Sequence, residues 1–117
     1  QRRAARQAEC LSAVRMGAVG WAVLLLTRKG VRVNFQDERG WTPLHHAASA
    51  NQEAMVEALV GLGAKLDVCD AHGNTPLHVA CLKKATGAAR RLAFCGADIE
   101  AVNNRGYTPI TRPVLFL

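Results

Sequence analysis

One stretch of the sequence decides the fold: residues 37–45, DERGWTPLH, which return as DAHGNTPLH at residues 70–78. A weaker copy, NNRGYTPIT, occupies residues 103–111. The copies are spaced by 33 residues, and Gly63 and Gly96 keep the same spacing. A fixed period of this size predicts stacked supersecondary units in place of one globular core. Because stacked units expose long surfaces, the period also favours binding over catalysis.

These residues resemble the ankyrin repeat. Its Thr-Pro-Leu-His-x-Ala signature is met at residues 42–47 and again at residues 75–80, and the resemblance covers about residues 9–112. It implies an all-α solenoid in which helix-turn-helix units stack and β-hairpin-type loops protrude. We expect a single domain over residues 1–117 with about three full repeats and a partial fourth, at approximately 4–36, 37–69, 70–102 and 103–117.

Each repeat is expected to contain a turn, a short helix, a second helix and an extended loop. Thr42 is a good N-cap, and Pro43 is tolerated at the first helical position. Gly63 and Gly96 are placed to stop the second helices. The first repeat lacks the Thr-Pro signature, so its helices are assigned by alignment. The expected helices are Glu9–Met16, Gly20–Arg28, Pro43 to about Ala50, Glu53 to about Gly61, Pro76–Lys83 and Thr86–Phe94.

The fourth repeat begins well and then departs from the pattern. Pro113 stands where Ala47 and Ala80 stand in the earlier repeats. A proline inside a helix costs roughly 3 kcal/mol. We therefore predict a half repeat whose residues 108–117 are the loosest part of the chain. Its apolar end, residues 114–117, either packs on the third repeat or supports weak self-association.

The net charge of +6 is concentrated at one end, since residues 1–36 hold seven Lys and Arg against one Glu. Two interpretations stay open. The cluster is a solvated, polar end of the solenoid, or it binds an anionic partner such as an acidic peptide, acidic lipid or nucleic acid. Nucleic acid is the weaker version, because only Trp21 and Phe35 lie among the basic residues.

No combination of residues indicates catalysis, and no cofactor or metal is expected. The resemblance implies that the rings of His45 and His78 bridge backbone groups of adjacent loops. Asp37 and Asp70 are loop acids that can cap turns through their side chains. The glycines follow the repeat spacing and match no phosphate-binding motif. We therefore predict that the protein is not an enzyme.

The cysteines and the hydropathy bear on location. Four cysteines without a Cys-x-x-Cys pair suggest free thiols in a reducing compartment, cytoplasmic or nuclear. The longest apolar run, Trp21–Leu26, is far shorter than the roughly 20 residues of a membrane span. No membrane-spanning segment and no signal peptide are expected.

The resemblance implies that the loop tips and the first helices line a concave face that binds a protein or peptide. Trp41, Asn74 and Tyr107 occupy one equivalent position and should form a row, as binding anchors or as a cover of the loop stack. Asn34 is the one loop asparagine at a position that can be hydroxylated in such repeats. A docking segment of a larger multidomain protein is a further alternative. The predicted contact residues are Glu38, Arg39, Trp41, Ser49, Ala71, His72, Asn74, Leu82, Lys83, Asn104, Arg105 and Tyr107.

Overall fold

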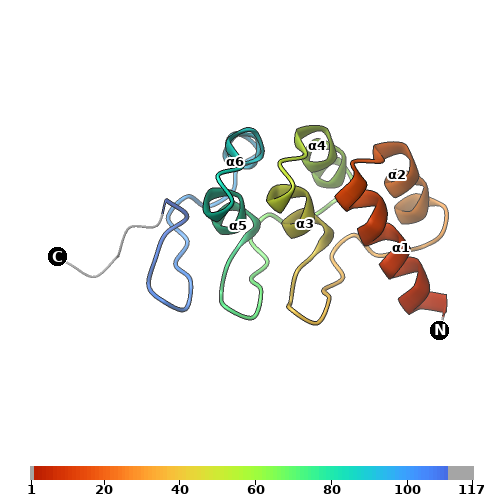
Figure 1. The fold of residues 1–117 in the computed structure, drawn as a ribbon, viewed down its shortest axis with the longest axis horizontal. Helices are drawn as coiled ribbons and strands as arrows, with labels where there is room; N and C mark the ends of the chain where they lie inside the picture. The colour runs from red at the N-terminus through yellow and green to blue at the C-terminus, as the bar shows by residue number, and fades with distance from the viewer. Residues whose placement is uncertain (1, 111–117) are drawn as a thin grey trace.

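The described part of the chain forms six helices arranged as three pairs (Figure 1). The computed structural model describes residues 2–110. In the view of Figure 1, α1, α3 and α5 form one layer and α2, α4 and α6 the other. The described residues contain no β-strand. The helices are α1 (Arg2–Met16), α2 (Val19–Thr27), α3 (Pro43–Ser49), α4 (Glu53–Gly61), α5 (Pro76–Leu82) and α6 (Thr86–Phe94).

The Thr-Pro-Leu-His stretches set the starts of α3 and α5. Thr42 is extended, and its Oγ1 accepts a hydrogen bond from the His45 N–H at 3.3 Å. The His45 Nδ1 in turn accepts from the Thr42 N–H at 3.1 Å. Thr75 and His78 repeat this reciprocal cap with the same distances. The N–H groups of the threonine and the histidine would otherwise lack a hydrogen-bond partner at the helix start. The signature therefore fixes the residue at which each helix begins.

The core runs along the stack between the two layers. Ala47, Ala48 and Ala80 are fully buried, which lets neighbouring helices approach closely. The large side chains fill the remaining space, each contributing roughly 1.5–3 kcal/mol through burial. The largest fully buried apolar side chains are Leu25, Leu44, Met55, Leu59, Leu92, Val14 and Val56.

A side chain of the second repeat caps a helix of the third. The N-cap position of α6 is Ala85, which offers no side-chain hydrogen bond. Instead, the Asn51 Oδ1 accepts from the Ala88 N–H at 2.9 Å. Asn51 holds a left-handed backbone (φ 56°), as does its counterpart Lys84 (φ 56°). Asparagine tolerates this conformation better than most residues, so Asn51 serves both its own turn and the neighbouring repeat.

Five of the six expected helices are confirmed to within one residue at each end. The prediction for the first helix is wrong, because α1 begins at Arg2 and not at Glu9. Residues 2–8 are Arg, Ala and Gln, which are strong helix formers, and no Thr-Pro pair interrupts them. Cys10 and Val14 anchor α1 in the core, and burial raises the pKa of the Cys10 thiol to about 11.

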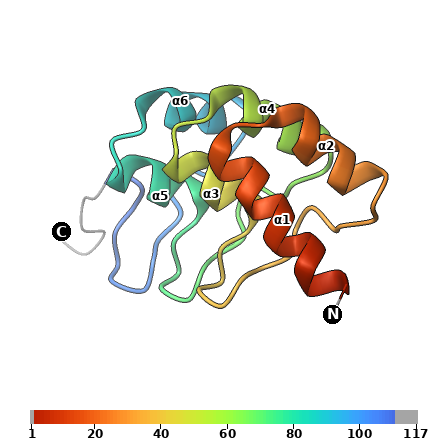
Figure 2. The same cartoon turned by 45° about the vertical axis from the view of Figure 1, so that its right-hand side comes forward.

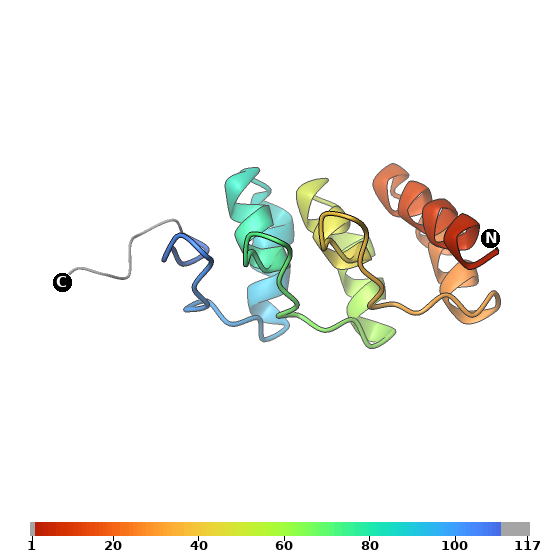
Figure 3. The same cartoon turned by 90° about the horizontal axis from the view of Figure 1, so that it is seen from below.

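Three hairpins protrude from the α1, α3 and α5 side of the stack (Figures 1 and 2). Seen from below, they follow one another along its length (Figure 3). They comprise residues 37–41, 70–74 and 103–107. The predictions for Pro113, for the apolar end and for self-association concern residues 111–117, which lie outside the described residues.

Candidate partner-binding surface

Each hairpin is closed by the same set of bonds. In the first, the Asp37 N–H donates to the Trp41 carbonyl at 2.9 Å. The Asp37 Oδ1 accepts from the amides of Arg39 and Trp41 at 3.0 and 2.9 Å. Asp70 and Asn103 make the equivalent side-chain bonds in the next two hairpins. The predicted turn-capping role of the loop acids is confirmed, and it presents the three tips in one conformation.

Backbone bonds hold adjacent tips in register. The Ala71 N–H donates to the Arg39 carbonyl at 3.1 Å. One repeat later, the Asn104 N–H donates to the His72 carbonyl at 3.0 Å. Side chains add to these main-chain bonds, because the Asn104 Nδ2 donates to the Ala71 carbonyl at 3.3 Å and the Asn103 Nδ2 donates to the Asn74 Oδ1 at 2.9 Å.

The two signature histidines bridge the repeats behind the tips. Because the His45 Nδ1 accepts from the Thr42 amide, its Nε2 carries the proton and donates to the Asn74 carbonyl at 2.9 Å. The His78 Nε2 donates likewise to the Tyr107 carbonyl at 2.9 Å. The predicted structural role of both rings is confirmed.

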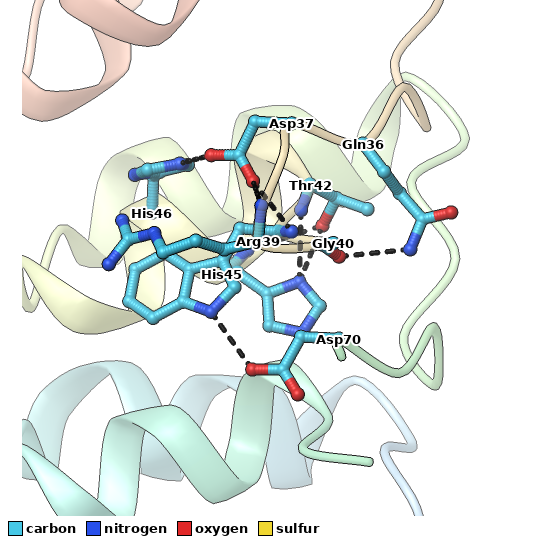
Figure 4. Close-up of polar contacts among 9 residues, drawn as sticks. Gln36, Asp37, Arg39, Gly40, Thr42, His45, His46 and Asp70 are labelled. Carbon is cyan, nitrogen blue, oxygen red and sulfur yellow. Dashed lines mark hydrogen bonds and ion pairs between the residues drawn. The ribbon is translucent and has the colours of Figure 1, made fainter. Parts of the chain in front are cut away.

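Trp41 takes part in this framework, and Figure 4 labels its neighbours Arg39, His45, His46 and Asp70. Its Nε1–H donates to the Asp70 Oδ2 at 2.9 Å. The indole ring stacks on His45 and meets the edge of His46, with centroid distances of 5.9 and 4.9 Å. The Arg39 guanidinium lies 4.1 Å from the ring centre. Trp41 is half-buried, and much of its ring is engaged within the protein.

Sequence analysis did not identify a pair that forms next to Trp41 between buried His46 and partly buried Asp37. The His46 Nε2 lies 2.9 Å from the Asp37 Oδ2. Burial lowers the pKa of His46, and Asp37 offsets this only in part. Burial also lowers the pKa of His45. Burial acts to raise the pKa of Asp37, but hydrogen bonds from His46 and from the amides of Trp41 and Arg39 outweigh it and hold that pKa below its usual range. The contact is therefore a hydrogen bond from a neutral imidazole to a carboxylate.

A hollow of about 320 Å³ lies between the second and third hairpins and the end of α5. Leu82 and Tyr107, at its edge, are 57% and 39% exposed. Polar side chains surround them. The hollow brings together six of the twelve predicted contact residues: His72, Asn74, Leu82, Asn104, Arg105 and Tyr107.

The other six predicted residues do not line this hollow. Glu38 and Arg39 are exposed at the first tip, and Ala71 at the second. Ser49 is half-buried at the end of α3, and Lys83 is exposed just beyond α5. The hollow also includes Asn103, His78, Thr108 and Pro109, which sequence analysis did not place at the surface of interest.

Asn34 joins the first repeat to the second. Its Oδ1 accepts from the Lys65 N–H at 2.8 Å, and its Nδ2 donates to the Gly63 carbonyl at 3.3 Å. Asp67 occupies the equivalent position and accepts from the Asp98 N–H at 3.2 Å. The hydroxylation of Asn34 stays a prediction.

Residues 2–110 contain neither a metal-binding cluster nor a membrane-spanning helix. No group of three His, Cys, Asp or Glu side chains in that range could hold a metal ion. None of the helices there combines the length and the apolar character needed to cross a bilayer.

The comparison with protein families decides the identity of the repeat. The family described as ankyrin repeats, in three copies, matches residues 11–111. The chain belongs to the ankyrin repeat family. Ankyrin repeats generally mediate protein–protein interactions, and the family is typically non-catalytic.

Several curated proteins share part of this ankyrin repeat chain. Calmodulin-binding transcription activator 6 of Arabidopsis thaliana is 47% identical over 45 residues, which is 38% of this chain and 5% of the relative. Calmodulin-binding transcription activator CBT of Oryza sativa subsp. japonica is 43% identical over 44 residues, again 38% and 5%. RelA-associated inhibitor of Mus musculus is 54% identical over 39 residues, 33% of this chain and 5% of the relative. The ankyrin repeat chain thus spans about 5% of the length of these relatives.

Proposed function

We propose that this ankyrin repeat chain is a non-catalytic module that binds a protein or peptide through its hairpin tips and the ends of α3 and α5. The observation that carries the proposal is the hollow beside Leu82 and Tyr107. The site is concave, and an exposed tyrosine and an exposed leucine lie at its edge among polar groups. Such a site can bury an apolar side chain of a peptide away from water while the polar groups bind the peptide around it.

The surroundings of the hollow suggest the chemistry of the partner. Arg105 and Asn104 are exposed at its rim, and no carboxylate of residues 2–110 contributes to its lining. An apolar side chain of the partner would occupy the hollow, and a neighbouring carboxylate would pair with Arg105. Arg39 and Trp41 extend the surface toward the first hairpin. We place this interaction in the cytoplasm or nucleus.

The test uses the whole chain as bait in a cell extract, followed by affinity measurements on the purified partner. Tyr107→Ala and Leu82→Ala should each weaken binding by roughly tenfold or more if they are anchors. Phe94→Ala is the matched control, because Phe94 is an aromatic residue that is 85% exposed on α6, in the other helix layer.

Circular dichroism of each variant checks that the fold is retained. Loss of binding in both hollow variants, with the Phe94→Ala affinity unchanged, would support the proposal. A partner that binds Tyr107→Ala and Leu82→Ala as tightly as the unmodified protein would contradict it.

A further inference from the structure

The N-terminal end of the stack carries a second pocket, with a volume of about 450 Å³. It lies between the first turns of α1 and the segment that follows α2. Among the residues that the structure describes, its lining includes Phe35 and no carboxylate. Five cationic side chains contribute to it: Arg2, Arg3, Arg6, Lys29 and Arg32.

The early start of α1 creates this pocket. Because the helix begins at Arg2, its first turns lie beside the loop that leaves α2 (Figures 1 and 2). The Arg6 Nη1 donates to the Lys29 carbonyl at 3.1 Å, which ties the helix to the loop. Residues from two separate elements thus converge on one space.

Within residues 2–110, the charges in the pocket have no ion-pair partner. Among the described residues, the ion pairs that form involve His46 and Arg91, and none involves the five pocket cations. Like charges gathered in one concavity create a strongly positive potential that attracts anions. A solvated polar end requires charges, but it does not require them to meet around a pocket.

We propose that this pocket binds a small ligand that carries several phosphate groups. Arginine guanidinium groups match phosphate oxygens bidentately, and four of the five cations are arginines. The volume suits a compact ligand. A single nucleic acid strand would need a row of aromatic platforms, and the described lining residues supply one aromatic side chain, Phe35. The same chemistry is offered by a free polyphosphorylated molecule and by a phosphorylated lipid headgroup.

The test is a titration of the whole chain with inositol hexakisphosphate at physiological ionic strength. Inorganic sulfate, an oligoglutamate peptide and a single-stranded oligonucleotide are the competitors. We expect saturable binding of inositol hexakisphosphate that none of the three displaces at equal charge concentration. Vesicles of phosphatidylcholine with and without phosphatidylinositol bisphosphate then separate the two sources of the ligand. Binding to the phosphorylated vesicles assigns the lipid, and failure to bind them assigns the free molecule.

Two charge-matched double variants make the test specific. Arg3→Gln with Arg32→Gln removes two exposed pocket cations and should weaken binding by about tenfold for each arginine. Lys65→Gln with Arg90→Gln removes two exposed cations elsewhere and should leave the affinity unchanged. The proposal fails if inositol hexakisphosphate does not bind, if both double variants lose affinity equally, or if the peptide or the oligonucleotide competes on equal terms.

Discussion

Replacing His45 with alanine tests whether the signature histidine holds the repeats together. His45 is fully buried, and its ring accepts from the Thr42 amide and donates to the Asn74 carbonyl. The substitution leaves the buried Thr42 N–H without its ring partner, at a cost of about 1–3 kcal/mol. The lost bond to Asn74 adds about 1 kcal/mol, and the space left by the ring adds a similar amount.

The expected total is about 3–5 kcal/mol, a large fraction of the 5–15 kcal/mol by which native proteins are stable. Urea unfolding followed by far-ultraviolet circular dichroism measures it directly. His72→Ala is the control, since His72 is exposed and should change stability by less than about 0.5 kcal/mol. If the two variants unfold with free energies within about 1 kcal/mol of each other, the bridging role assigned to His45 is wrong.

Three more predictions concern the framework. The two buried histidines of the second repeat have lowered pKa values. The unfolded chain therefore binds more protons than the folded protein once the pH drops below about 6.5. The free energy of unfolding should then fall by up to about 1.4 kcal/mol per pH unit for each ring. A urea midpoint that is constant from pH 8 to pH 5 would contradict this. Gly40→Ala should destabilise the protein more than Gly106→Ala in thermal melts. Both glycines have φ near +80°, but a Cβ at Gly40 would meet the next hairpin's backbone at 2.9 Å, while one at Gly106 meets nothing within 4 Å. Asn51→Ala should cost about 1 kcal/mol more than Lys84→Ala in urea unfolding, because only Asn51 caps the Ala88 amide; equal losses would remove that role.

The frame was predictable because its signals are local and repeated. The Thr-Pro pair and the histidine three residues beyond the threonine set the start of the first helix of a repeat, and the glycine after the second helix marks where that helix ends. Each acts in the same way wherever it recurs. The start of α1 was not predictable, because the first repeat lacks these signals and helix propensity alone carries the helix back to Arg2.

The candidate surface was only partly predictable. Equivalent positions in the repeats place the tip residues on one side of the stack. They do not show which of these side chains make contacts within the protein and which stay exposed. Trp41 is engaged by Asp70 and His46, whereas Tyr107, at the equivalent position, is exposed beside the hollow. The Asn51 cap has no counterpart elsewhere in the sequence, since lysine stands at the next equivalent position. A contact that occurs in only one repeat cannot be predicted from the periodic pattern of the sequence.

The hydrogen bonds between neighbouring hairpins also affect how the stack of repeats responds to a mechanical force. A force that pulls the two ends apart acts on each junction in series, because each repeat touches only its neighbours. The Ala71–Arg39 bond and the His45 bridge resist it between the second and third repeats. Within residues 2–110, the junction of the first and second repeats has no bond between hairpins, because α1 stands where a hairpin would lie. The main-chain bonds between hairpins therefore stiffen the second-to-third and third-to-fourth junctions, whereas the hydrogen bonds of the Asn34 side chain join the first repeat to the second.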